Sequence, residues 1–227
     1  SLRFSGSATS TGYLTLSDDK TLLSFTGGNT ITTGVNVNTI LPRGVGSFNN
    51  IGTFTLSTTY TGSSGQQTRS VTTKNNLNWF IGDQAGIYTN GSTSASPSAN
   101  ARAVKSFGGI VYVGSASGSL TQVSTLATPS GASLVGLPGL VTNPAHQDFY
   151  LVSSGSNGSS YDVLYTISAT SNTLGTLEKF SFIFTNFKII LFFFKGINIK
   201  FFFIFNEIVE RFSFLISKNM QLLLMFC

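Results

Sequence analysis

Three arginines carry the first chemical signal in the sequence, because each opens a short segment of the form Arg-x-Val. These segments begin at Arg43, Arg69 and Arg102. Guanidinium groups that recur at one place in successive units could form a cationic ligand face, which would attract carboxylates. The alternative is that each arginine bonds carbonyl groups of the adjoining unit and lays its stem on Trp79 or Phe107. Both interpretations stay open here, and the ligand of such a face would be a glycan or a protein.

Catalytic residues are not predicted. The lone imidazole, His146, follows Pro144 in a turn-rich stretch, so we expect a solvated loop residue rather than a general base. The G-x-S-x-G elbow of hydrolases is missing, since residues 114–118 place their serines wrongly. Paired carboxylates for glycoside hydrolysis would have to come from Asp18, Asp19, Asp83, Asp148, Asp162 and Glu178.

Those carboxylates have simpler roles in turns. Asp18, Asp19 and Lys20 together predict a hairpin turn, because Asp side chains bond their own backbone in such turns. Asp83 and Asp162 each stand beside an apolar strand. There we expect a position in a turn rather than a position that faces a channel enclosed by the sheets. We therefore expect no enzyme activity from the chain as given.

Cofactors and metals are not predicted either. One cysteine, Cys227, and one histidine cannot build a zinc site of clustered Cys and His, and no phosphate-binding or calcium-binding loop is present. The net charge is +5, but the basic residues of the first 179 positions are scattered rather than clustered. Tracking a phosphate backbone requires clustered Lys and Arg, so we expect no nucleic-acid partner.

The elements that would position these residues are short β-strands. Apolar residues alternate in brief runs between Gly, Asn, Ser and Thr, which is the period of half-buried strands rather than helices. The runs centre on residues 13–16, 22–25, 54–56, 79–81, 110–113, 149–152 and 163–167. Turns are predicted at 27–29, 90–91, 108–109 and 157–158, where Gly or Asn tolerates a positive φ.

Internal repetition favours one all-β architecture over the others. The segments that begin at Arg69 and Arg102 each continue through an Asn or Gly turn into a strongly apolar strand, a glycine and a further strand. The segment at Arg43 looks like a third copy. A meander that repeats in this way is typical of the blades of a β-propeller.

The chain also resembles a group of Ser/Thr/Gly-rich secreted or surface β-propeller proteins. The resemblance rests on residues 12–23, on the Arg69 and Arg102 units, on residues 137–140 and on residues 175–181, and it covers roughly residues 5–180. It implies a propeller, but blades of about 40–45 residues give only about four units here. We therefore predict an incomplete propeller over 1–180, whose open edges need missing blades or a partner to cover them.

Residues 181–227 differ sharply in composition. Positions 180–227 hold 14 of the 21 Phe and both Met, and residues encoded by A/T-rich codons dominate them. Lys188, Lys195 and Lys200 interrupt the apolar window, and each would cost about 2.5–3.5 kcal/mol at the centre of a bilayer. We interpret this hydrophobic, helical or disordered tail as translated non-coding sequence or as a marginal membrane segment.

Two Asn-Gly-Ser sequences, at Asn90 and Asn157, match the N-glycosylation pattern. They agree with an extracellular or cell-surface location, with membrane association through the tail as the alternative. No signal peptide is seen, and the true N-terminus is expected to lie upstream. The sequence thus predicts a non-catalytic propeller scaffold or recognition module; the alternatives are a fragment of a lactonase-like or glycan-cleaving propeller enzyme and a membrane-anchored surface protein.

Overall fold

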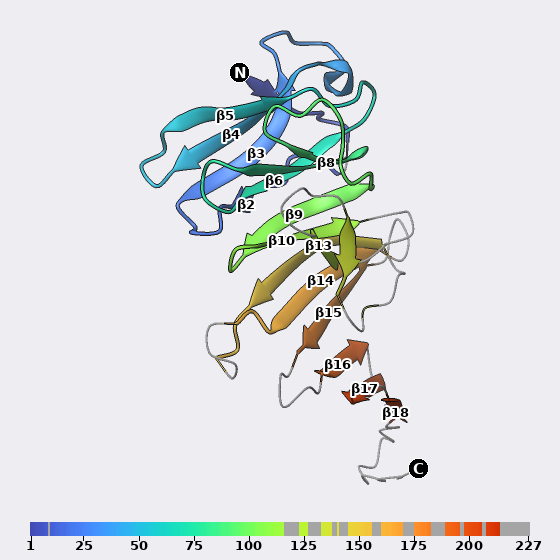
Figure 1. Cartoon of the computed structure of the whole chain (residues 1–227). Helices are drawn as coiled ribbons and strands as arrows, with labels where there is room; N and C mark the ends of the chain where they lie inside the picture. Colours follow the sequence, from blue (N-terminus) through green and yellow to red (C-terminus); the bar gives the residue numbers. More distant parts are fainter. Residues whose placement is uncertain are drawn as a thin grey trace. The chain divides into compact units, whose positions relative to one another are not determined.

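A computed structural model of the chain describes residues 1–8, 10–115, 123–126, 133–137, 140, 145–155, 160–169, 175–182, 189–195, 198–205 and 208–213. The described residues form antiparallel sheets and one turn of 3-10 helix, η1 (Val37–Thr39), so the predicted all-β class is confirmed (Figure 1). The chain divides into two compact units, Ser1–Asp148 and Phe149–Cys227. The boundary predicted from composition, at residue 180, stays a prediction.

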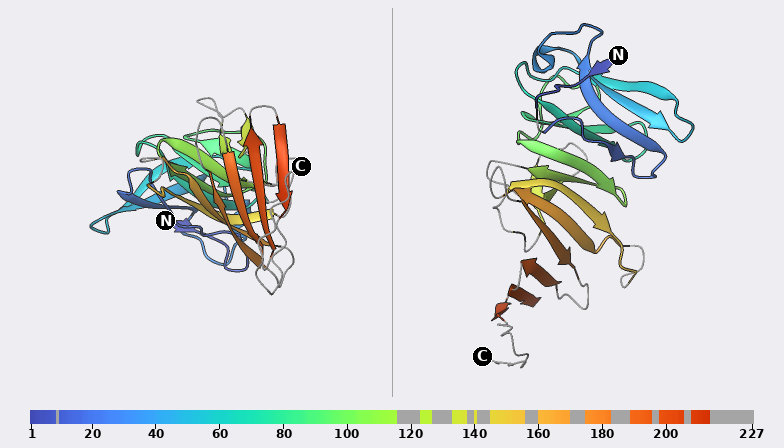
Figure 2. Two further views of the ribbon diagram at one scale, coloured as in Figure 1. Left: turned by 90° about the horizontal axis from the view of Figure 1, so that it is seen from below. Right: turned by 180° about the vertical axis from the view of Figure 1, so that it is seen from behind.

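The first unit contains three successive sheets (Figure 2, right). The first sheet consists of β1 (Leu2–Arg3), β2 (Thr15–Leu16), β3 (Leu22–Asn29), β4 (Arg43–Asn49) and β5 (Phe54–Tyr60). The second consists of β6 (Thr68–Thr73), β7 (Trp79–Asp83) and β8 (Gly86–Thr89). The third consists of β9 (Ala101–Phe107), β10 (Ile110–Ser115), β11 (Val123–Leu126) and β12 (Leu134–Gly136). None of these described sheets closes on itself.

Two further sheets follow along the chain. The fourth consists of β13 (Ala145–Val152), which begins before the unit boundary, β14 (Val163–Ala169) and β15 (Gly175–Ser181). The fifth consists of β16 (Ile189–Lys195), β17 (Asn198–Phe205) and β18 (Ile208–Ser213).

The helical alternative for the tail is wrong where the structure describes that region. β18 pairs antiparallel with β17, from Phe205 opposite Ile208 to Lys200 opposite Ser213. Runs of Phe, Ile and Val have high β-propensity, which explains why strands form here rather than a helix. No helix among the described residues has the length and apolar character needed to cross a membrane.

The second sheet is buried on both faces, which explains the unbroken apolar run of β7. Trp79 and Ile81 pack into one cluster with Val45 and Tyr60 of the first sheet. Phe80, which points the opposite way, packs into a second cluster with residues of the third sheet. The apolar run of β7 therefore indicates a strand that is covered on both faces rather than a strand with one solvated face.

A polar seam joins the first and second sheets beside this core. It consists of Tyr13–Asp18, which includes β2, and Arg69–Thr73 of β6. The Tyr13 amide donates to the Arg69 carbonyl at 3.3 Å, and the Asp18 amide donates to the Thr73 carbonyl at 2.9 Å. Between them, the Thr72 hydroxyl donates to the Leu16 carbonyl at 3.2 Å. Backbone groups that point out of one sheet are thus satisfied by the next.

One predicted turn is wrong. Gly27 and Gly28 lie inside β3, and neither has a positive φ. A Cβ at Gly27 would lie 2.6 Å from the Arg3 carbonyl oxygen, and a Cβ at Gly28 would lie 3.0 Å from Val37. These glycines allow other segments to approach the strand closely. The turns at 90–91 and 108–109 are confirmed, and the turn at 157–158 lies outside the described residues.

Candidate functional site

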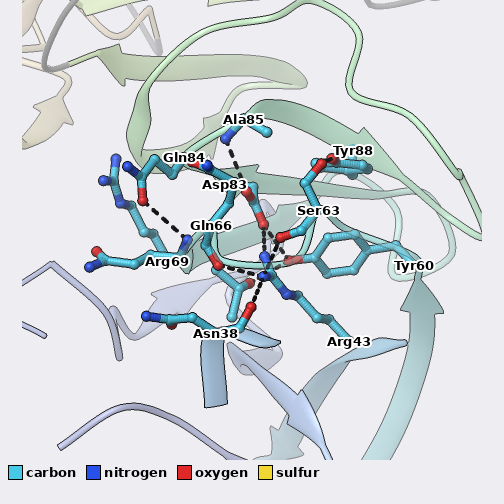
Figure 3. Close-up of polar contacts among 12 residues, drawn as sticks. Asn38, Arg43, Tyr60, Ser63, Gln66, Arg69, Asp83, Gln84, Ala85 and Tyr88 are labelled. Carbon is cyan, nitrogen blue, oxygen red and sulfur yellow. Dashed lines mark hydrogen bonds and ion pairs between the residues drawn. The ribbon is translucent and has the colours of Figure 1, made fainter. Parts of the chain in front are cut away.

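The guanidinium of Arg43 lies at the centre of a polar network in the first unit (Figure 3). Arg43 lies on β4 and is completely buried. Its Nη1 forms an ion pair with the Asp83 carboxylate, which ends β7 of the second sheet. Its Nη2 donates to the carbonyls of Asn38 at 2.9 Å and Ser63 at 2.8 Å, and also to that of Gln66. The side chain therefore ties the first sheet, two loops and the second sheet together.

Asp83 is saturated by the same network. Its Oδ1 accepts the Ala85 amide at 3.0 Å, and its Oδ2 accepts the Tyr60 hydroxyl, also at 3.0 Å. Burial raises the pKa of Asp83, against the lowering effects of the Ala85 amide, Arg43 and Tyr60. Burial also raises the pKa of Tyr60, which keeps the phenol neutral. Asp83 thus has a turn and packing role within a closed network, as its position beside an apolar strand suggested.

Close approach to Arg43 requires a glycine in the neighbouring loop. Gly62 has a φ of +74°, and a Cβ there would lie 2.9 Å from Arg43 Cδ. A side chain would push the loop that supplies the Ser63 and Gln66 carbonyls away from the guanidinium.

Arg69 forms the corresponding tie between the second and third sheets. Its side chain is buried, and Nη1 donates to the Ala101 carbonyl at 2.9 Å and to the side-chain oxygen of Asn100. Burial and the positive charge of Arg102 lower the pKa of Arg69 to about 10. Arg102 itself lies on β9 and is half-buried, and its carbonyl accepts the Ser70 hydroxyl at 2.7 Å.

The three predicted ligand-face arginines therefore occupy different positions. Arg69 and Arg102 lie on β6 and β9, the first strands of the second and third sheets, whereas Arg43 lies on an inner strand of the first sheet. Arg69 bonds a carbonyl of the adjoining sheet, as the structural alternative expected, and Arg43 bonds a carboxylate there instead. A ligand-binding role stays a prediction, and partial exposure is found at Arg102 but not at the other two.

The predicted hairpin turn at Asp18, Asp19 and Lys20 is confirmed. Asp19 Oδ1 accepts the Ser17 hydroxyl at 2.6 Å and the Thr21 amide at 3.0 Å. These bonds, with that of Ser17 the strongest, lower the pKa of Asp19 to about 2. Asp18 reaches further and accepts the Ser106 hydroxyl at 2.9 Å and the Gly109 amide at 3.0 Å, so the hairpin turn is anchored to the third sheet.

The remaining candidate carboxylates each have their own partners. Asp148 pairs with Lys105 at 2.7 Å. In the second unit, Asp162 accepts the Ser154 amide at 2.7 Å and hydroxyl at 2.6 Å, and Glu178 accepts the Ser168 hydroxyl at 3.3 Å. No group of three metal-ligating side chains occurs among the residues with described positions.

The expectation of a solvated loop histidine is wrong. His146 lies on β13 and is 1% exposed. Burial lowers its pKa to about 4, so the imidazole is neutral at pH 7. Pro144 suggested a turn, but the strand begins at Ala145, directly after the proline, and Pro is tolerated at that boundary.

Of the two potential glycosylation sites, the structure describes Asn90 but not Asn157. Asn90 is exposed, but its Oδ1 accepts the Trp79 amide at 2.7 Å and its Nδ2 donates to the Leu77 carbonyl at 2.6 Å. A glycan at Nδ2 would have to coexist with this second bond. Asn157 lies outside the described residues, as do Cys227 and positions 116–118 of the serine-containing segment.

A cavity near the N-terminus was not predicted from the sequence. Its volume is about 610 Å³, and residues 3–8, 32–38 and Gln67 line it. Most lining side chains carry a hydroxyl or an amide, and Arg3 carries the charge. Ser, Thr and Asn are common throughout the chain, so their presence in two of its loops gave no distinguishing signal.

Comparisons of the chain with protein-family models, curated proteins and solved structures find no match. The two candidate sites for binding a ligand are therefore the Arg43 network and the cavity near the N-terminus. The Nη groups of Arg43 are already bonded to Asp83 and to three carbonyls, so the Arg43 network has no room for a ligand there. The cavity is the remaining candidate for a ligand site, because it is concave and several polar side chains converge on it.

Proposed function

We propose that the chain is a non-catalytic scaffold of the β-propeller type that recognises a ligand outside the cell or at its surface. One observation carries this proposal: arginine side chains tie successive sheets in chain order. Arg43 of the first sheet reaches Asp83 of the second, and Arg69 of the second reaches Ala101 of the third. Sheets that stack face to face in sequence order, each completing its neighbour, are what a radial array of blades requires.

The outer face of the first sheet supports the need for a further sheet or a partner. Phe25, Phe48 and Phe54 pack against one another there, with ring centroids 5.5–6.2 Å apart. Phe54 and Leu56 are 44% and 42% exposed. A contiguous apolar patch of this kind on a soluble protein marks a surface that another element covers.

The face that the same sheet turns toward the second sheet is more polar. Ser24 and Val45 lie on it, and the Ser24 hydroxyl donates to the Val71 carbonyl of β6 at 3.3 Å. Val45 nevertheless packs into an apolar cluster with Trp79 and Ile81, so both faces of the first sheet carry apolar side chains. The proposal explains this, since both faces of an internal blade are covered by neighbouring blades.

Binding of the purified full chain to an array of cell-surface glycans and extracellular proteins tests this function. We expect saturable binding to a restricted set, with every bound ligand recovered chemically unchanged by mass spectrometry. Cleavage of a bound glycan, or opening of an added lactone, would show an enzyme instead. Absence of binding to every surface ligand would refute recognition.

A further inference from the structure

We propose that the cavity beside η1 binds a saccharide that carries a carboxylate, and that Arg3 holds the carboxylate. This inference rests on the proposed recognition function and assigns it a site and a ligand class. Arg3 is the charged member of the lining, and no carboxylate is among the described residues that surround the cavity. An anionic group could therefore enter without meeting a negative charge.

The donors of Arg3 are only partly used. Nη2 donates to the Ile31 carbonyl at 3.0 Å, while Nε is buried and has no partner among the described residues. A guanidinium has five N–H donors in a planar fork that matches the two oxygens of a carboxylate. The N–H donors of Nη1 and Nη2 that the Ile31 bond leaves over would hold the carboxylate.

The backbone that carries Arg3 is fixed by the first sheet. Arg3 pairs with Gly28 in the β1–β3 ladder. Because Gly27 has no Cβ, the Arg3 carbonyl can approach β3 closely. The guanidinium consequently starts from a strand rather than from a free loop end. A site built on a strand loses less entropy when it orders a ligand.

The wall formed by residues 32–38 and Gln67 is also fixed before a ligand arrives. Asn36 caps η1, since its Oδ1 accepts the Asn38 amide at 3.1 Å. The Asn38 carbonyl in turn accepts from Arg43, and Gln67 Oε1 accepts the Ser10 hydroxyl at 2.8 Å. The Arg43 network therefore supports one wall of the cavity, and Thr32 and Thr33, which carry hydroxyls, also line the cavity.

An aromatic ring completes the match to a sugar. Phe4 is 52% exposed and is part of the lining. The negative face of an aromatic ring attracts the C–H groups on the flat side of a pyranose, just as it attracts the edge of another ring. Hydroxyl-rich walls, one aromatic ring and one guanidinium suit an acidic sugar better than a nucleic acid, which requires several clustered cations.

A trimer of galacturonic acid and its methyl ester are suitable probes, because they share ring shape and differ in charge. With the full chain and isothermal titration calorimetry at low salt, we expect the acid to bind at least about tenfold more tightly than the ester. Arg3→Gln should remove this preference. Ser7→Trp, which keeps Arg3 and fills space in the cavity, should abolish binding of both probes. The matched control, Lys20→Gln on the distant hairpin turn, should bind like the unaltered chain.

Each other outcome overturns part of the assignment. Equal binding of acid and ester by the unaltered chain would reject the role of Arg3, and unchanged binding by a folded Ser7→Trp variant would reject the cavity. Competition by acetate or sulfate as strong as that by the trimer would show a simple anion site. Array binding that survives Ser7→Trp would leave the recognition function in place while rejecting this site.

Discussion

Replacing Arg43 with Met is expected to lower the free energy of unfolding by about 3–5 kcal/mol. The substitution keeps much of the apolar stem but leaves the buried Asp83 carboxylate without its cation. It also removes one donor from the Asn38 and Ser63 carbonyls, which keep only the backbone amides of Gly65 and Gln66. Urea denaturation at pH 7 measures the loss. Lys20→Met, at an exposed position, serves as the control and should change stability by less than about 0.5 kcal/mol.

A double variant separates the ion pair from its surroundings. Arg43→Met combined with Asp83→Asn removes both charges, so its cost should be clearly smaller than the sum of the two single costs. Additive costs would show that Arg43 and Asp83 do not interact. A cost below about 1 kcal/mol for Arg43→Met would contradict the tie between the first two sheets.

The second large effect is a loss of stability in acid that depends on His146. Its pKa is about 4 in the folded protein and near 6.5 in the unfolded chain. Between these values the unfolded state binds more protons, so the contribution is fully present above about pH 6.5 and is lost as the pH falls toward 4. The loss amounts to about 3 kcal/mol at pH 4.

Other groups titrate in this range, so the comparison needs His146→Gln. The difference in unfolding free energy between the unaltered chain and the variant should shrink by about 3 kcal/mol from pH 7 to pH 4. A difference that stays constant with pH would mean that the imidazole is solvated in the folded state, as its place after a proline suggested.

Alternation and turn chemistry predicted the strands of the first unit well. The apolar run at 79–81 and the Asp-Asp-Lys turn are local patterns, and local hydrogen bonds and burial fix both. The turn predicted at Gly27 and Gly28 is wrong because a glycine can serve either a turn or the close approach of another segment to a strand. The distinction depends on the residues that approach the strand, Arg3 at Gly27 and Val37 at Gly28.

The sites were less predictable than the strands. Arg43 stands in an Arg-x-Val segment like those of Arg69 and Arg102, yet its carboxylate partner is forty residues along the chain. No spacing rule links the two residues, since the packing of two sheets brings them together. The cavity presents the same difficulty, because its two walls are loops of ordinary polar composition that become neighbours through β1 and β3.

The tie that Arg43 makes between the first two sheets has a functional consequence. The Arg43 guanidinium donates to the carbonyl of Asn38, and Asn38 belongs to the cavity wall. The tie between the first two sheets therefore also shapes the candidate binding site. Stability of the scaffold and shape of the site are therefore coupled. We expect substitutions in the tie to weaken recognition even when they lie outside the cavity.

Amide hydrogen exchange at the seam tests the central claim, that successive sheets form one cooperatively folded scaffold. The Tyr13 and Asp18 amides donate across to carbonyls of β6, so NMR should show that they exchange by the same global unfolding as the amides of β7. Their protection should fall with denaturant in parallel with that of β7. Fast exchange at Tyr13 and Asp18 that is insensitive to denaturant, while β7 stays protected, would show independent sheets and contradict the account.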